Sequence, residues 1–70
     1  MEMKEFNLST EYIELIKLLK LLRLVESGGM AKLVVDEGLV LLNGETEFRK
    51  RAKVRKGDIV EFEGQRIAIV

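Results

Sequence analysis

The hydrophobic and polar positions in the middle of the chain predict a helix, a strand and a tight turn in direct succession. Apolar residues recur there at three- and four-residue spacing and indicate one buried helix face: Met30, Ala31, Val34 and Val35. Ser27 precedes them as a suitable N-cap, and Gly38 follows them as a residue that can end a helix in the left-handed conformation. The apolar run 39–42 then predicts a strand that ends at Asn43-Gly44, a strong signal for a type I′ turn.

Another helix is predicted upstream, from Tyr12 to about Leu24, where apolar residues cover most of the cylinder. Its polar stripe repeats every three residues and consists of Lys17, Lys20 and Arg23. Ser9 or Thr10 is the expected N-cap, with acidic residues in the first turn. Because the connection at Val25-Glu26 is so short, we expect the two helices to cross or fold back on each other.

Short apolar runs elsewhere predict strands at 3–8, 45–48, 59–62 and 65–70. In the last of these, Ile67 and Ile69 alternate with Ala68 and Val70. A turn is predicted at Glu63-Gly64. The predicted fold class is therefore α+β, with a helix-turn-helix-like pair packed on a small, mostly antiparallel sheet. Residues 1–70 are expected to form a single domain, because seventy residues are too few for two cores.

Composition removes several classes of chemistry. The chain has neither Cys nor His, which leaves no thiol or imidazole nucleophile and no usual zinc site. We therefore expect no metal and no cofactor. The acidic pairs 45/47 and 61/63 lie on solvated strand faces with nothing to bury them, so we expect no enzyme. Cations interrupt the apolar stretch 13–25, which argues against a signal peptide or membrane span and favours a cytoplasmic protein.

Positive charge is concentrated in one segment, although 12 basic and 12 acidic residues cancel over the whole chain. Six cations and no acid lie between Phe48 and Gly57: Arg49, Lys50, Arg51, Lys53, Arg55 and Lys56. If the segment is extended, alternate side chains project to one side and can neutralise successive phosphates. The other interpretation is a solvated loop whose cations pair with nearby acids: Glu45, Glu47, Asp58 or Glu61.

Three further groups have both a functional and a purely structural interpretation. The amides of Ser27-Gly28-Gly29 form either an anion site or a plain helix cap. Lys32 either shares that anion or pairs with Asp36 one turn on. The stripe that begins at Lys17 is either the solvent side of a helix or a secondary phosphate-facing stripe. Aromatic residues are few and only Phe48 is a candidate for base contact, which favours recognition of folded RNA by shape and backbone.

The conjunction of these signals resembles the alpha-L RNA-binding motif, the domain named for ribosomal protein S4. It looks most like the small stand-alone bacterial members of the YbcJ and YaaA type. The resemblance spans roughly Tyr12 to Phe62 and is carried by Leu18-Leu19-Lys20, Glu26-Ser27-Gly28-Gly29-x-Ala31-Lys32, Glu37-Gly38, Leu42-Asn43-Gly44, Glu47-x-Arg49-Lys50-Arg51-x-Lys53 and Gly57-Asp58. Many members of the larger family have Arg directly after the capping Ser, where this chain, like the stand-alone members, has Gly28.

In the family, the second helix and the following strand form an L-shaped surface that holds structured RNA. Together with the basic run, the resemblance implicates Ser27, Lys32, Asn43, Arg49, Lys50, Arg51, Lys53, Arg55 and Lys56. The expectation is a non-catalytic, monomeric protein that docks ribosomal or transfer RNA, with the ribosome or a ribosomal precursor as a further partner. The alternative is an adaptor whose basic loop meets an acidic protein, and binding of duplex DNA is a third, weaker hypothesis. Salt separates the first two, because phosphate contacts give a steep salt dependence.

Overall fold

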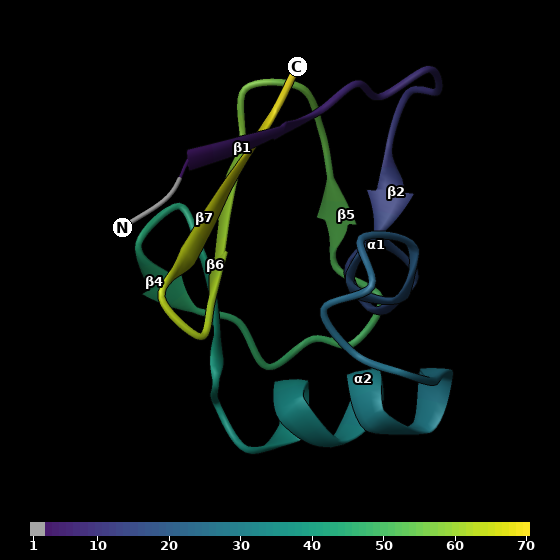
Figure 1. Cartoon of the computed structure of the whole chain (residues 1–70), viewed down its shortest axis with the longest axis vertical. Helices are drawn as coiled ribbons and strands as arrows, with labels where there is room; N and C mark the ends of the chain where they lie inside the picture. Colours follow the sequence, from purple (N-terminus) through teal and green to yellow (C-terminus); the bar gives the residue numbers. More distant parts are fainter. Residues whose placement is uncertain (1–2) are drawn as a thin grey trace.

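The computed structural model describes residues 3–70, which form two helices, a five-stranded sheet and a two-stranded ribbon (Figure 1). The sheet has the order β1-β7-β6-β3-β4, with bounds β1 (Met3–Phe6), β3 (Val40–Leu42), β4 (Glu45–Thr46), β6 (Ile59–Phe62) and β7 (Gln65–Ile69). Its neighbours pair antiparallel, except that β1 runs parallel to β7. The ribbon pairs β2 (Ile13–Glu14) antiparallel with β5 (Lys53–Val54). The helices are α1 (Leu15–Leu21) and α2 (Gly28–Asp36).

The predicted succession of helix, strand and turn after residue 27 is confirmed. The Ser27 Oγ accepts a hydrogen bond from the backbone amide of Met30 at 3.1 Å and caps α2. Gly38 adopts a left-handed φ of 72° directly after the helix. Asn43 and Gly44 both have positive φ, 54° and 85°, as a type I′ turn between β3 and β4 requires.

The first helix is shorter than predicted, because the residues before it form a strand. Ile13 lies opposite Val54 in the β2–β5 ribbon, so α1 begins only at Leu15 and not at Tyr12. Neither Ser9 nor Thr10 caps the helix; the Thr10 hydroxyl instead donates to the backbone carbonyl of Tyr12 at 2.9 Å. The prediction failed because the apolar pattern of the helix includes Tyr12 and Ile13, whereas pairing with β5 makes residues 13–14 a strand.

Carbonyl groups of the basic segment take the place of a side-chain cap on α1. The amides of Leu15 and Ile16 donate to the carbonyl oxygens of Ala52, at 2.9 Å, and of Lys50, at 3.1 Å. These are amides that a helix cannot satisfy internally. The other end of α1 also falls short of the predicted Leu24: the helix ends at Leu21, and Arg23 has a left-handed φ of 59°.

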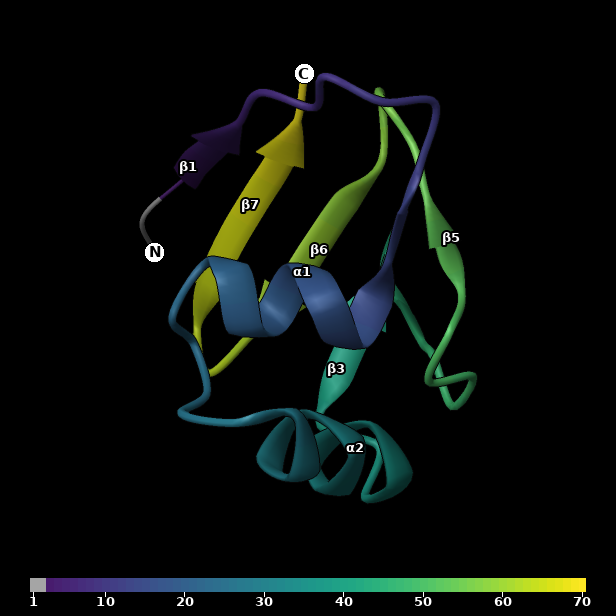
Figure 2. The ribbon, with the colours of Figure 1, turned by 90° about the vertical axis from the view of Figure 1, so that its right-hand side faces the viewer.

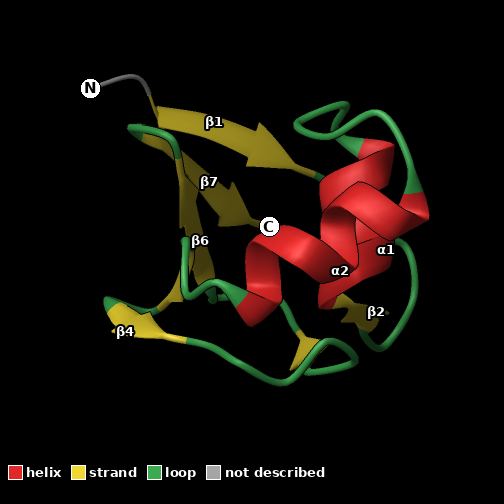
Figure 3. Cartoon of the chain, turned by 90° about the horizontal axis from the view of Figure 1, so that it is seen from below, coloured by secondary structure: helices red, strands yellow, loops and turns green. Residues whose placement is uncertain are grey.

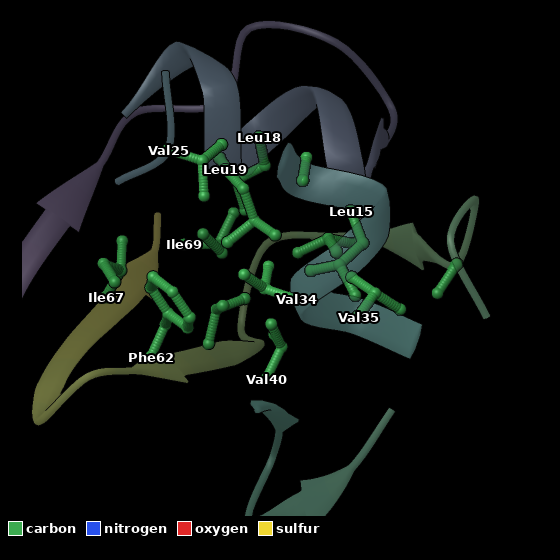
Figure 4. Packing of buried hydrophobic residues seen from close by; sticks show 14 of the residues in the cluster. Leu15, Leu18, Leu19, Val25, Val34, Val35, Val40, Phe62, Ile67 and Ile69 are labelled. Carbon is green, nitrogen blue, oxygen red and sulfur yellow. The ribbon is translucent and has the colours of Figure 1, made fainter. Parts of the chain in front are cut away.

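The core lies between the helices and one face of the five-stranded sheet. Figure 3 shows both helices together beside the sheet, and Figure 2 shows α1 lengthwise with α2 nearly end-on, so the two helices cross as expected. Figure 4 shows the packing of core residues that include Leu15, Leu18 and Leu19 of α1, Val34 and Val35 of α2, and Val40, Phe62, Ile67 and Ile69 of the sheet. Val60 of β6 belongs to the same cluster. Ile67 and Ile69 are buried, as their alternation predicted.

Two features differ from the predicted pattern at the edges of this core. Met30 is 44% exposed, because helix geometry turns it away from Ala31 toward the solvent side of α2. The strand predicted at 45–48 ends at Thr46, so Phe48 lies in the loop that follows. None of the helices within residues 3–70 has the length and apolar character needed to cross a bilayer.

The end of α2 provides a test of the glycine at position 38. A Cβ built on Gly38 would lie 3.2 Å from Cε1 of Phe48, in addition to its φ of 72°. Gly44 also has a positive φ, but its Cβ would meet nothing within 4 Å. We expect Gly38→Ala to lower the free energy of unfolding by about 2 kcal/mol and Gly44→Ala by about 1 kcal/mol. Urea unfolding measures both, and equal losses would show that the Phe48 contact is unimportant.

The Asn43 side chain ties the turn to the start of β6 and gives a second test. Its Nδ2 donates to Asp58 Oδ1 at 3.0 Å, and its Oδ1 accepts from the amide of Ile59 at 2.8 Å. Asn43→Gly keeps the positive φ and removes both bonds, so we expect a loss of about 1–2 kcal/mol in urea unfolding. Glu63→Gly is the matched control, since Glu63 also has a positive φ, 51°, and its side chain has no hydrogen bond within residues 3–70. A larger loss in the control would contradict this role for Asn43.

Candidate functional site

The basic segment 49–56 is held at the surface by two buried residues. Ala52 is 3% and Val54 0% exposed, whereas the residues that alternate with them, Arg51, Lys53 and Arg55, are exposed. Only Lys53–Val54 is a strand, but exposed and buried side chains alternate over 51–55, as predicted for an extended segment. Four cations line one shallow depression of about 480 Å³: Arg49, Arg51, Lys53 and Arg55. The fold therefore gathers on one face the charges that the sequence places in one segment.

Two of the six cations are engaged by acids, and one of these pairs, Arg49 with Glu47, is among those that the alternative interpretation predicted for this loop. Arg49 Nε lies 3.0 Å and Nη2 3.1 Å from the two carboxylate oxygens of Glu47. The hydrogen bonds from Arg49 hold the pKa of Glu47 below its usual value, and the same pairing raises the pKa of Arg49. Lys50 Nζ lies 2.9 Å from Asp36 Oδ1, on α2. These pairs leave Arg49 and Lys50 partly neutralised.

The other four cations of the segment have no ion pair with an acid of residues 3–70: Arg51, Lys53, Arg55 and Lys56. Asp58, a predicted partner, uses its carboxylate differently. Its Oδ2 accepts from the backbone amide of Arg55 at 2.8 Å, and its Oδ1 accepts from Asn43. Asp58 therefore fixes the backbone at the end of the segment and leaves the cationic side chains available to an anionic ligand.

Tyr12 also belongs to this surface, although it was not among the candidate site residues predicted from the sequence. Its ring lies under two cations, with Lys53 Nζ 4.9 Å and Arg55 Cζ 5.9 Å from the ring centroid. The sequence pattern predicts Tyr12 in the first turn of a helix, whereas the pairing of the next two residues with β5 puts it beside that strand. Tyr and Ile at 12–13 are strand-favouring residues, which was the available signal. Phe48, the aromatic residue that we did consider, is 61% exposed but leans on Gly38 at the end of α2.

One side of α2 continues the basic surface. Gly28, Lys32 and Asp36 recur every four residues and so follow the same side of the helix. Asp36 pairs with Lys50 and not with Lys32, which was one of the two interpretations of Lys32. This side of α2 therefore adjoins the basic segment, and Lys32 lies about 6 Å farther along it. The Ser27 hydroxyl accepts the capping bond of α2, and the Asn43 side chain binds Asp58 and the amide of Ile59, so both residues fix the backbone of this surface.

The stripe predicted on α1 lies elsewhere. Lys17 and Lys20 are exposed on the helix, while Arg23 follows its end. With Leu21 these three residues line another shallow depression, of about 320 Å³, which shares no lining residue with that of the basic segment. The stripe and the basic segment are therefore separate features of the surface.

The chain is similar to proteins of known family. Residues 6–70 match the pattern of a family described as "S4 domain". "Probable ribosome maturation protein RlbA" of Bacillus subtilis (strain 168) is 45% identical over 58 residues, 83% of this chain and 82% of that protein. "Putative RNA-binding protein YbcJ" of Escherichia coli (strain K12) is 41% identical over 69 residues, 97% of this chain and 99% of that protein.

A solved structure agrees with this similarity. The solution structure of YbcJ from E. coli, described as revealing an alpha-L motif involved in RNA-binding, has a TM-score of 0.74 and 39% identity. The likeness covers 100% of this chain and 90% of that one. Both the resemblance drawn from the sequence motifs and the predicted fold of two helices on a mostly antiparallel sheet are confirmed. The chain belongs to the S4 domain family.

Proposed function

We propose that this protein docks folded RNA through the outward side of residues 51–56. The proposed target is ribosomal RNA or its precursors, with transfer RNA as the alternative. The names of the RlbA and YbcJ relatives support a role in RNA binding and in ribosome maturation. The proposed activity is binding without catalysis, in the cytoplasm. The observation that carries the proposal is the row of exposed cations, without acidic partners in residues 3–70, on a backbone fixed by buried Ala52 and Val54.

Docking through this row is electrostatic and insensitive to sequence. Side chains at alternate positions of an extended segment are about 6.6 Å apart, so Arg51, Lys53 and Arg55 can contact separate phosphates. An Arg side chain also grips a phosphate through two parallel hydrogen bonds, which Lys cannot do. Lys32 and the amino end of α2 lie on the adjoining surface and would fix the orientation of the RNA. Arg49 and Lys50 are proposed to contribute less, since each already contacts a carboxylate.

Removing three of these charges tests the proposal. The variant Arg51→Gln, Lys53→Gln, Arg55→Gln keeps side chains of similar length but loses three phosphate contacts. We expect its affinity for a folded ribosomal RNA hairpin to fall and its log–log salt slope to become shallower by about 2 to 3. Fluorescence anisotropy at several salt concentrations measures both, with a DNA duplex of the same sequence in parallel.

The control removes the same charge from other parts of the surface. In Lys4→Gln, Lys20→Gln, Arg23→Gln three exposed cations are lost that do not line the depression of the basic segment, and we expect the salt slope to change by less than about one contact. An unchanged slope in the first variant, with its fold intact by circular dichroism, would contradict the proposal. Equal losses in both variants would mean that the binding is spread over the whole surface.

Adding a cation to α2 should strengthen binding. Gly28 has no positive φ, and a Cβ there would meet nothing within 4 Å, so Gly28→Arg places a new charge on the side that carries Lys32. We expect tighter binding to the RNA hairpin and a salt slope steeper by about 0.7 to 0.9. Met30→Arg is the matched control, because it adds the same charge to the first turn on the opposite, exposed side. A gain in both variants, or in neither, would contradict the proposed orientation.

A further inference from the structure

Tyr12 lies at the boundary between two surface depressions of different chemistry. On one side is the depression of the basic segment, which is lined by four cations and by no acid. On the other side, Tyr12 itself lines a depression of about 550 Å³ between the amino-terminal segment and α1. The pairing of Ile13 with Val54 turns these two residues inward, which leaves Tyr12 on the outer face with Lys53 and Arg55.

The second depression suits a flat, uncharged group. Its apolar lining includes Phe6 and Leu8 beside the Tyr12 ring, and Ser9 and Thr10 supply polar groups at its border. Glu11 and Glu14 also line it beside one cation, Lys17, and this excess of negative charge opposes the entry of a phosphate. A nucleobase has both properties that this lining favours, an apolar face and edges that form hydrogen bonds.

We propose that Tyr12 stacks on an unpaired base of the RNA while Lys53 and Arg55 hold the phosphates on either side of that nucleotide. This rests on the proposed RNA binding and narrows its target to a folded RNA with a bulged or looped-out nucleotide next to a helix. Tyr12 is 39% exposed and lines the second depression, so it is open to a ligand. Lys53 Nζ and Arg55 Cζ lie over the ring, and we expect both side chains to reach phosphates that flank a base stacked there.

Tyr12 and Arg55 directly flank the β2–β5 ribbon, and Lys53 belongs to β5, so the aromatic residue and the two cations lie together. Stacking on an aromatic ring does not depend on which base is present, whereas it does require that the base leave its helix. The ribbon therefore distinguishes RNAs by the position of an unpaired nucleotide relative to the backbone. Phe48 is the competing candidate for the base contact, but its ring leans on Gly38 and it lines neither depression.

The test uses two RNA hairpins with the same stem, one fully paired and one with a single bulged 2-aminopurine. Four full-length proteins are compared: wild type, Tyr12→Phe, Tyr12→Leu and Phe48→Leu. We expect wild type to prefer the bulged hairpin and to quench the aminopurine fluorescence by stacking. Tyr12→Leu should lose about fivefold or more in affinity for the bulged hairpin and less than about twofold for the paired one. Tyr12→Phe should behave as wild type, because it retains the ring.

Each outcome decides one part of the argument. Equal affinity of wild type for both hairpins, or unchanged fluorescence, would overturn the stacking role even if Tyr12→Leu proved unstable. Loss of the preference in Phe48→Leu with retention in Tyr12→Leu would move the base contact to Phe48. If wild type also binds the paired hairpin tightly and in a salt-dependent manner, the proposed RNA binding is supported whichever of these two results is obtained. No binding of wild type to either hairpin would overturn both proposals together.

Discussion

The surface chemistry of this protein depends on two backbone hydrogen bonds at the start of α1, where Leu15 and Ile16 donate to the carbonyls of Ala52 and Lys50. A helix needs partners for its first amides, and here the basic segment provides them. The segment consequently cannot move away from the core without exposing those amides and its buried valine, Val54. A run of like charges that would repel itself in a free loop is thereby held in one conformation.

The elements that could be predicted from the sequence are those with local signals. Ser27, Gly38 and the Asn43-Gly44 pair act on neighbouring residues, so the second helix, its strand and its turn follow from the pattern alone. The start of α1 could not be predicted in this way, because a tertiary partner about forty residues later turns 13–14 into a strand. Local propensity determines the secondary structure of a segment only where no long-range strand pairing competes with it.

The candidate site likewise has features that could be predicted from the sequence and features that could not. The outward alternation of cations and the pairing of Arg49 with nearby Glu47 follow from sequence spacing, but the acid that neutralises Lys50 comes from a distant element. Asp36 reaches Lys50 only because the loop passes the end of α2, and Tyr12 reaches Lys53 only because β2 exists. A net charge of zero likewise averages over the whole surface, whereas a ligand meets one face of it.

The parallel pairing of β1 with β7 has a consequence for how the sheet assembles. Met3 lies opposite Arg66 and Phe6 opposite Ile69, so this contact closes a loop of more than sixty residues. The turns at Asn43-Gly44 and Glu63-Gly64, in contrast, close loops of only a few residues, which costs far less chain entropy. Because β1 is also an edge strand with mostly exposed side chains, we expect its amide protons to exchange with solvent before those of the central strand β6. The sheet would then form from its centre outward, with β1 the last strand to join.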